Sequence, residues 1–171
     1  MNYSVAAVLR DGTTVLVRAL APADRPGLVD LFNRLSPRSV YFRFFHVKQR
    51  LTEADLSQLT EVDFRNEVSL AVTIAEAGGE RIVGVGRYAA GSGGKRAEVN
   101  FTVADEHQRR GIGKLLLEHL VAIAQKNGIT EIEAYVLADN SQMLRVFLGG
   151  GFRVTRRLEE GVYHLTSPIV G

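Results

Sequence analysis

The chain has 171 residues, of which 46% are hydrophobic and 23% are charged, and its formal net charge at pH 7 is +2. This length and balance predict one folded domain over residues 1–171, with its core at about 11–166. So small a net charge gives no indication of a nucleic-acid or membrane-surface partner. The absence of cysteine excludes disulfides, thiolate metal sites and a cysteine nucleophile. No stretch approaches the ~20 apolar residues that cross a bilayer. We therefore expect a cytoplasmic protein without a metal, either a monomer or a homodimer.

The first half of the sequence predicts a strand, three helices and a β-hairpin. Asp24 suits the N-cap of the first helix, because its side chain can accept a hydrogen bond from the first turn. The expected elements are a strand at 13–18, helices at 24–33, at 39–45 and from Thr52, and antiparallel strands at 68–75 and 81–90 joined through Gly78-Gly79.

The second half alternates strands and helices more regularly. The expected elements are strands at 97–103 and 131–137, helices at 113–127 and 140–148, and two final strands at 152–155 and 163–166. A strand–helix–strand unit of this kind is a right-handed crossover, so the strands at 97–103 and 131–137 are predicted to be parallel. The whole order predicts a single α/β or α+β layered domain.

The most informative segment is the loop from Gln108 to Lys114, Gln-Arg-Arg-Gly-Ile-Gly-Lys, between a strand and a helix. Free N–H groups at a helix start and glycines that admit a close ligand together form a phosphate cradle. The alternative is a tight turn whose arginines only face water. The nucleoside-triphosphate loop is excluded, because its glycines stand further apart and Ser or Thr follows its lysine. The dinucleotide loop is excluded because it needs three glycines.

The same loop resembles the signature of the GNAT superfamily of N-acetyltransferases: Gln or Arg, two residues, Gly, one residue, then Gly or Ala. The family's second landmark, an Asn followed by a helix that ends before Gly-Phe, corresponds to Asn140 and Gly151-Phe152. The resemblance implies a mixed, mainly antiparallel sheet of six to seven strands with a central parallel pair, flanked by about four helices. It also implies acetyl-CoA as the cosubstrate.

Within this superfamily the chain is similar to the acetyltransferase domain of Pat-type bacterial protein lysine acetyltransferases. The similarity is carried by three segments, Leu9-Arg10-Asp11-Gly12, Ser36 to Phe44 and Ala97-Glu98-Val99-Asn100-Phe101. In that family the domain is usually fused to a regulatory cyclic-nucleotide domain or to an acyl-CoA-synthetase-like module. The sequence contains neither, so it is interpreted as a free-standing relative or an excised catalytic domain.

The resemblance assigns roles along the chain. The family's catalytic glutamate corresponds to Glu98, which would deprotonate the amine and shares a strand face with Asn100 and Thr102. In the alternative interpretation Glu98 is not catalytic and forms an ion pair with Arg87 or Lys95. Other, weaker candidates for the base are Asp63, Glu67 and His46. Cofactor contacts are expected from Phe101, Thr102, Val103, Gln108, Arg109, Arg110, Gly111, Ile112, Gly113, Lys114, Asn140 and Phe147.

Two of these positions leave the chemistry open. Many family members have a Tyr seven residues after the Asn, which protonates the leaving thiolate, but this chain has Phe147 there. No general acid is therefore assigned. Asn140 could contact the cofactor or could only cap a helix. The strand before the loop and the strand at 131–137 are expected to diverge, so that backbone groups around 101–103 become free for the pantetheine arm and the oxyanion.

Three functions are compatible with these features. The leading hypothesis is acetylation of a protein lysine side chain, with the acceptor near Arg38–Arg50 and Val162–Pro168. The first alternative is acetylation of a small-molecule amine, because the fold does not choose the acceptor. The second is a non-catalytic acyl-CoA sensor, which would have no need of a carboxylate at Glu98.

Overall fold

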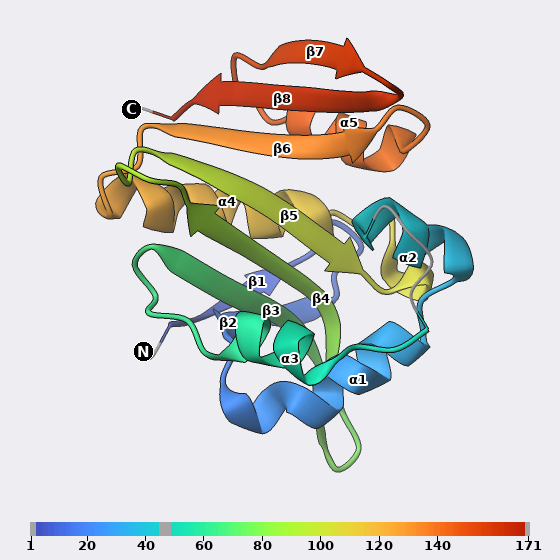
Figure 1. Ribbon diagram of the computed structural model, residues 1–171. Coiled ribbons are helices and arrows are strands. Elements are labelled where there is room, and N and C mark those ends of the chain that lie inside the picture. Colours follow the sequence, from blue (N-terminus) through green and yellow to red (C-terminus); the bar gives the residue numbers. More distant parts are fainter. Residues whose placement is uncertain (1–2, 45–48, 170–171) are drawn as a thin grey trace.

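The computed structural model describes residues 3–44 and 49–169, and these form one mixed sheet with helices on both faces (Figure 1). Over these residues the sheet has eight strands in the order β1-β2-β3-β4-β5-β6-β8-β7. The strands are β1 (Ser4–Val8), β2 (Thr14–Ala19), β3 (Glu67–Glu76), β4 (Gly79–Ala90), β5 (Arg96–Val103), β6 (Glu131–Leu137), β7 (Thr155–Glu159) and β8 (Val162–Pro168). The helices are α1 (Arg25–Asn33), α2 (Pro37–Phe44), α3 (Glu53–Thr60), α4 (Ile112–Lys126) and α5 (Ser141–Leu148), with short 3-10 turns at Pro22–Asp24 and Asp105–His107.

Two hydrophobic cores hold the helices to the sheet. The larger core joins α4 and α5 to one face, and its buried residues include Leu116, Leu120 and Phe101. The smaller core joins α1 and α3 to the opposite face through residues such as Leu28 and Leu56. Figure 1 shows α4 behind the sheet and α1 and α3 in front of it. Because α1 and α3 cover only the β2–β4 part of their face, the face formed by β5, β6 and β8 is left without them.

The sequence predicted the order of most elements correctly. The β3–β4 hairpin is antiparallel, and β5 and β6 are parallel, as expected of a crossover unit. The sheet has one strand more than the upper limit of six to seven, because β1 was not predicted. Its sequence, Ser-Val-Ala-Ala-Val, lies at the edge of the sheet and is mostly exposed, so it lacks the alternation of a half-buried strand. The described residues also form five α-helices, which are the five expected along the sequence and one more than the resemblance implied.

The strand predicted at 152–155 was misplaced. The structure begins β7 at Thr155, and all five of its residues, Thr-Arg-Arg-Leu-Glu, are exposed, so hydrophobic patterning gives no signal for it. The apolar residues Phe152 and Val154 pack against the larger core from an irregular segment. Their alternation therefore resembles a strand without forming one.

The parallel strands β5 and β6 pair over only three positions before they diverge. The paired residues are Arg96 with Glu131, Ala97 with Ile132, and Glu98 with Glu133. Beyond them β5 continues to pair with β4, and β6 continues to pair with β8. The facing edges of β5 and β6 therefore have no strand partner among the residues described, and Figure 1 shows the two strands separating toward α2. The expected divergence is present.

Two glycines on β4 let α4 lie close to the sheet. A Cβ atom at Gly84 would come within 2.8 Å of Ile112 Cγ2, and one at Gly86 within 3.2 Å of Leu120 Cδ1. A Cβ at Gly84 would clash with Ile112 and push the helix away, and one at Gly86 would force Leu120 to shift by a few tenths of an ångström. The glycines thus fix where the N-terminus of α4 stands relative to the end of β5.

Candidate active site

The loop before α4 turns through two residues with left-handed backbone. Arg109 has φ 64° and Gly111, the N-cap of α4, has φ 91°. Only glycine adopts this conformation without strain, which explains the glycine at 111. No heavy atom lies within 4 Å of the place where a Cβ of Gly111 would be. The space beside Gly111 is therefore open, and the first N–H groups of α4 have no partner within the helix, as an anion-binding helix start requires.

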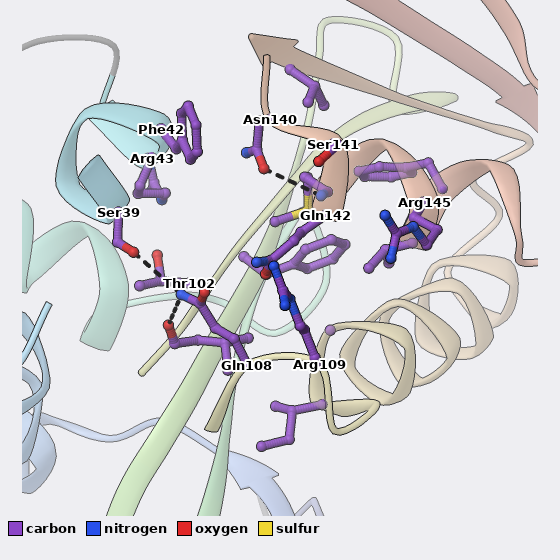
Figure 2. Close-up of a pocket in the computed structure, with 18 of the residues that line it drawn as sticks. Ser39, Phe42, Arg43, Thr102, Gln108, Arg109, Asn140, Ser141, Gln142 and Arg145 are labelled. Atoms are coloured by element: carbon purple, nitrogen blue, oxygen red, sulfur yellow. Dashed lines mark hydrogen bonds between the residues drawn. The ribbon is translucent and has the colours of Figure 1, made fainter. Parts of the chain in front are cut away.

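Gln108 fixes this loop to its surroundings. Its side-chain amide donates hydrogen bonds to the carbonyl oxygen of Val103 at 3.0 Å and to the hydroxyl of Ser39 at 3.2 Å (Figure 2). The first bond joins the loop to the end of β5, and the second joins it to α2. The side chain of Asp105 also accepts a hydrogen bond from the Ser36 N–H at 3.0 Å. The hydrogen bonds from Gln108 to Ser39 and from Ser36 to Asp105 hold α2 beside the loop.

Arg110 points away from the site. Its guanidinium donates to Asp11 Oδ2 at 2.8 Å and to Thr13 Oγ1 at 2.7 Å, so it ties the loop to the turn between β1 and β2. Hydrogen bonds from the N–H and the side chain of Thr13, followed by the one from Arg110, lower the pKa of Asp11 to about 2. The sequence grouped Arg110 with the cofactor-binding residues, but its side chain does not line the cavity described next.

A cavity of about 480 Å³ opens where β5 and β6 diverge. The loop, α2, α5 and the two strand ends form its walls, and Figure 2 shows Ser39, Phe42 and Arg43 on one side with Gln142 and Arg145 on the other. All the predicted cofactor-binding residues except Arg110 line it. Its lining also carries an excess of cations over carboxylates: Arg10, Arg38, Arg43, Arg109, Lys114 and Arg145 against Asp105 and Asp139. Such a surface suits a large anion.

Asn140 and Phe147 have structural roles in the wall of this cavity. The side-chain oxygen of Asn140 accepts a hydrogen bond from the Met143 N–H at 3.2 Å and caps α5. The ring of Phe147 is buried and stacks on Phe101, with ring centroids 5.4 Å apart and an interplanar angle of 23°. Asn140 is therefore a helix cap that also lines the cavity, and Phe147 provides an apolar wall.

Glu98 is an exposed residue at the last paired position of β5 with β6. Among residues 3–44 and 49–169 it has no ion-pair partner within 4.0 Å. The predicted alternative partner Arg87 instead donates to Glu67 Oε1 at 2.8 Å. Glu98 does not line the cavity itself, but the next two residues, Val99 and Asn100, do. Its carboxylate is thus open to solvent beside the point where the strands separate.

Arg43 is a charged group near Glu98. Burial, with help from the positive charge of Arg87, lowers the pKa of Arg43 to about 10, and the negative charge of Glu98 opposes this shift. Arg43 therefore lies within electrostatic reach of the carboxylate at the edge of the cavity.

The weaker candidates for the base have other roles in the structure. Asp63 accepts hydrogen bonds from the N–H groups of Arg65, Asn66 and Glu67, each at 2.9 Å, and these bonds lower its pKa. Glu67 pairs with Arg87, and neither carboxylate lines the cavity. His46 lies outside the residues that the structure describes.

Several residues that line the cavity belong to no recognisable sequence motif. Arg43 on α2, Tyr135 on β6, and Gln142 and Arg145 on α5 reach the cavity only because of the way the elements pack. The sequence gives one weak indication for Tyr135. It lies between the apolar Ala134 and Val136, which are buried on one face of β6, so the alternation of a strand places Tyr135 on the opposite face. Of the two segments expected near the acceptor, Arg38–Arg50 contributes α2 to the cavity wall while its residues 45–48 lie outside the described part of the chain, and β8 lies beside β6.

A family model described as "Acetyltransferase (GNAT) family" matches residues 32–152, which include the loop, both diverging strands and Glu98. The chain belongs to the GNAT acetyltransferase family. It is therefore an acetyltransferase, and its sheet with one parallel pair is the GNAT fold. No described helix is long and apolar enough to cross a membrane. No cluster of three or more possible metal ligands is found in the described part of the chain.

Relatives of this GNAT acetyltransferase include Pat proteins. It is 33% identical over 144 residues to Acetyltransferase PA5475 of Pseudomonas aeruginosa, covering 84% of this chain and 77% of the relative. It is 31% identical over 139 residues to Acetyltransferase Pat of Mycolicibacterium smegmatis, covering 81% of this chain but only 41% of that protein. The crystal structure of the GNAT domain of S. lividans PAT superposes with a TM-score of 0.88 at 38% identity, covering 96% of both chains.

Proposed function

We propose that this acetyltransferase transfers the acetyl group of acetyl-CoA to the side-chain amine of a protein lysine, by direct attack of the amine on the thioester. The cavity between the diverging strands carries the proposal, because the glycine loop stands at one end of it and Glu98 lies on the strand that borders it. The similarity to Pat-type protein lysine acetyltransferases supports lysine as the acceptor. The chain spans 41% of the Mycolicibacterium Pat, so nothing outside the matched part of that protein is carried over.

The glycine loop fits a pyrophosphate. The N–H groups at the start of α4 lie at the positive end of the helix dipole, and the open space at Gly111 leaves room for phosphate oxygens. Arg109 and Lys114 beside the loop, with Arg145 across the cavity, supply positive charge. These groups would hold the diphosphate and adenosine part of acetyl-CoA.

The open edges of β5 and β6 fit the pantetheine arm. From Val99 to Val103, β5 has a strand partner only on its β4 side, so its other backbone groups are available to pair with the amides of the arm. Around Phe101 to Val103, N–H groups of the same edge would meet the carbonyl oxygen of the thioester. Donors that are fixed before the reaction stabilise the negative charge that develops on this oxygen.

Glu98 would act as the base. A lysine amine has an ordinary pKa near ~10.4, so at pH 7 it must lose a proton before it can attack. Glu98 takes this proton, the nitrogen forms a bond to the carbonyl carbon, and the carbon–sulfur bond breaks. The proton passes from the exposed carboxylate to solvent, which also protonates the leaving thiolate. Phe147 has no proton to donate, so no side chain is assigned to that last step.

The test of this function is acetylation of a cell lysate. The purified protein is incubated with acetyl-CoA and a lysate, and acetyl-lysines are mapped by mass spectrometry, with the Glu98→Gln protein at equal concentration as the control for non-enzymatic acetylation. We expect specific lysines to be acetylated only by the unchanged protein. Equal lysine acetylation in both samples, with acetylation of small amines by the unchanged protein alone, would favour a metabolite acceptor instead.

A further inference from the structure

A stacked pair of rings on β6 and β8 stands beside the cavity. Tyr135 on β6 and His164 on β8 are opposite each other in the antiparallel register. Their ring centroids are 4.6 Å apart and the rings are nearly parallel, at 8°. Because β6 lies between β5 and β8, His164 covers the Tyr135 ring on the side away from β5. Tyr135 also lines the cavity and is 45% exposed, so its remaining surface is open to a ligand.

Carboxylates flank this ring pair. Glu133 lies two residues before Tyr135 on the same face of β6, and its Oε1 is 2.7 Å from His164 Nε2. Glu98 lies across from Glu133 on β5. Burial raises the pKa of Tyr135, and the negative charges of Glu133 and Glu98 add to that shift, so both carboxylates are electrically close to the phenol. Cations are also near: Arg96 Nη1 lies 3.9 Å from Glu133 while Arg96 Nε forms an ion pair with Glu131, and Arg43 in the cavity wall lies within electrostatic reach of Glu98.

The ring and the carboxylates together suit a cation with an alkyl stem. An aromatic face attracts an ammonium group and packs against methylene groups, and neighbouring carboxylates strengthen the attraction. The glycine loop has the opposite character, because Arg109 and Lys114 beside it both line the cavity. The loop therefore favours an anion, whereas the face of Tyr135 with its two carboxylates favours a cation.

We propose that Tyr135, backed by His164 and flanked by Glu133 and Glu98, is the platform that binds the acceptor, and that it selects a lysine-type amine over an anionic or uncharged one. This inference rests on the proposed function and deepens it. Glu98 deprotonates the amine, whereas Tyr135 positions its stem. The ring face makes the contact with the acceptor and the phenol hydroxyl faces Glu133, so phenylalanine, which keeps the ring, should retain most of the lysine binding.

The experiment measures binding without turnover. Nα-acetyl-lysine methylamide is titrated by NMR into the protein saturated with CoA, and Nα-acetyl-norleucine methylamide, which lacks the amine, serves as the matched ligand. We expect Tyr135→Ala to weaken lysine binding by about 2- to 30-fold, the range of a cation–π contact. Tyr135→Phe should retain most of the lysine binding. Val8→Ala is the control for a surface truncation, because Val8 is 69% exposed on the edge strand β1 and does not line the cavity.

A second set of titrations tests the role of charge in acceptor binding. Lysine should bind more tightly than norleucine, and Glu133→Gln should reduce that preference. The affinity for CoA, measured in each variant, should not change. Equal lysine binding by Tyr135→Ala and the unchanged protein would overturn the platform, and so would the lack of any lysine binding. The lysate assay is independent: acetylated lysines with an unaffected Tyr135→Ala would leave the function standing without the platform. If Tyr135→Ala loses lysine binding but the unchanged protein acetylates no lysine in the lysate, the platform is supported and the proposed function is not.

Discussion

Phe147 stacks on Phe101 at 5.4 Å across the wall of the cavity, and so joins α5 to the strand that borders the site. Phe147 is the position at which the resemblance to the GNAT superfamily led us to look for a tyrosine. Both rings are buried, which makes the pair a packing contact as well as a wall. Its removal should therefore affect stability and not only the site.

Phe147→Ala should lower the free energy of unfolding by about 3–5 kcal/mol, because a buried aromatic ring is replaced by a cavity. Urea denaturation of the purified protein measures this. Phe147→Leu is the matched control, since it keeps most of the volume and should cost less than half as much. Equal and small losses for both variants would mean that α5 does not rely on the ring.

Acetyl-CoA should raise the melting temperature of the isolated chain. A ligand that binds only the folded state stabilises it by mass action, by about 2.7 kcal/mol at a concentration one hundred times its Kd. Thermal melts across an acetyl-CoA series measure the shift, and desulfo-CoA should produce a similar one because the loop holds the diphosphate. A flat series up to millimolar acetyl-CoA, supported by calorimetry without heat of binding, would contradict the assignment of the cavity.

Gly111→Val should weaken acetyl-CoA binding more than Arg109→Ala does. Valine is strained at φ 91° and places methyl groups in the space left open for phosphate oxygens. Arg109 is exposed, so its charge contributes only a screened attraction. Calorimetric Kd values decide between the two, and Arg109→Gly serves as a further variant that also suits the left-handed backbone. A larger loss from Arg109→Ala would indicate a side-chain clamp in place of the backbone cradle.

Sequence patterns located those parts of the site that are local in the chain. The loop from Gln108 to Lys114 could be found because glycines at a strand–helix junction have a physical meaning without any partner. The direction of Arg110 could not be found, since its partner Asp11 is 99 residues away. Arg145 and Tyr135 likewise reach the cavity only through the packing of α5 and the divergence of β6 from β5. Long-range contacts of this kind leave no periodic signal.

The Arg110–Asp11 contact predicts a pH effect. The pKa of Asp11 is about 2 in the folded chain against an ordinary 3.8. A lowered pKa means that the ionised carboxylate stabilises the fold above pH ~4, and that this contribution is lost as the pH falls through about 2. NMR titration of the Asp11 carboxyl should give the low value, and Arg110→Ala should raise it only in part, because the hydrogen bonds from Thr13 remain. An unchanged titration in Arg110→Ala would show that the contact is absent in solution.

The last prediction concerns Glu98→Gln. This change keeps the size of the side chain but removes the base, so turnover at pH 7 should fall by roughly 10²–10⁴-fold while the Kd for acetyl-CoA stays the same. The variant should fold normally, because the exposed Glu98 carboxylate makes no ion pair within 4.0 Å in the described part of the chain. Raising the pH should recover part of the rate, since more of the amine is then already neutral.

Glu67→Gln is the matched control, because Glu67 was a weaker candidate for the base and its carboxylate is engaged by Arg87. It should retain turnover within a few-fold under the same conditions. Steady-state rates from pH 6 to 9 for the three proteins, with calorimetry for acetyl-CoA, separate a chemical defect from a binding defect. Near-native turnover of Glu98→Gln at pH 7 would remove Glu98 from the mechanism. A defect that is the same at every pH would mean that Glu98 positions the acceptor and does not take its proton, because the loss of a base is smaller where the amine is already neutral.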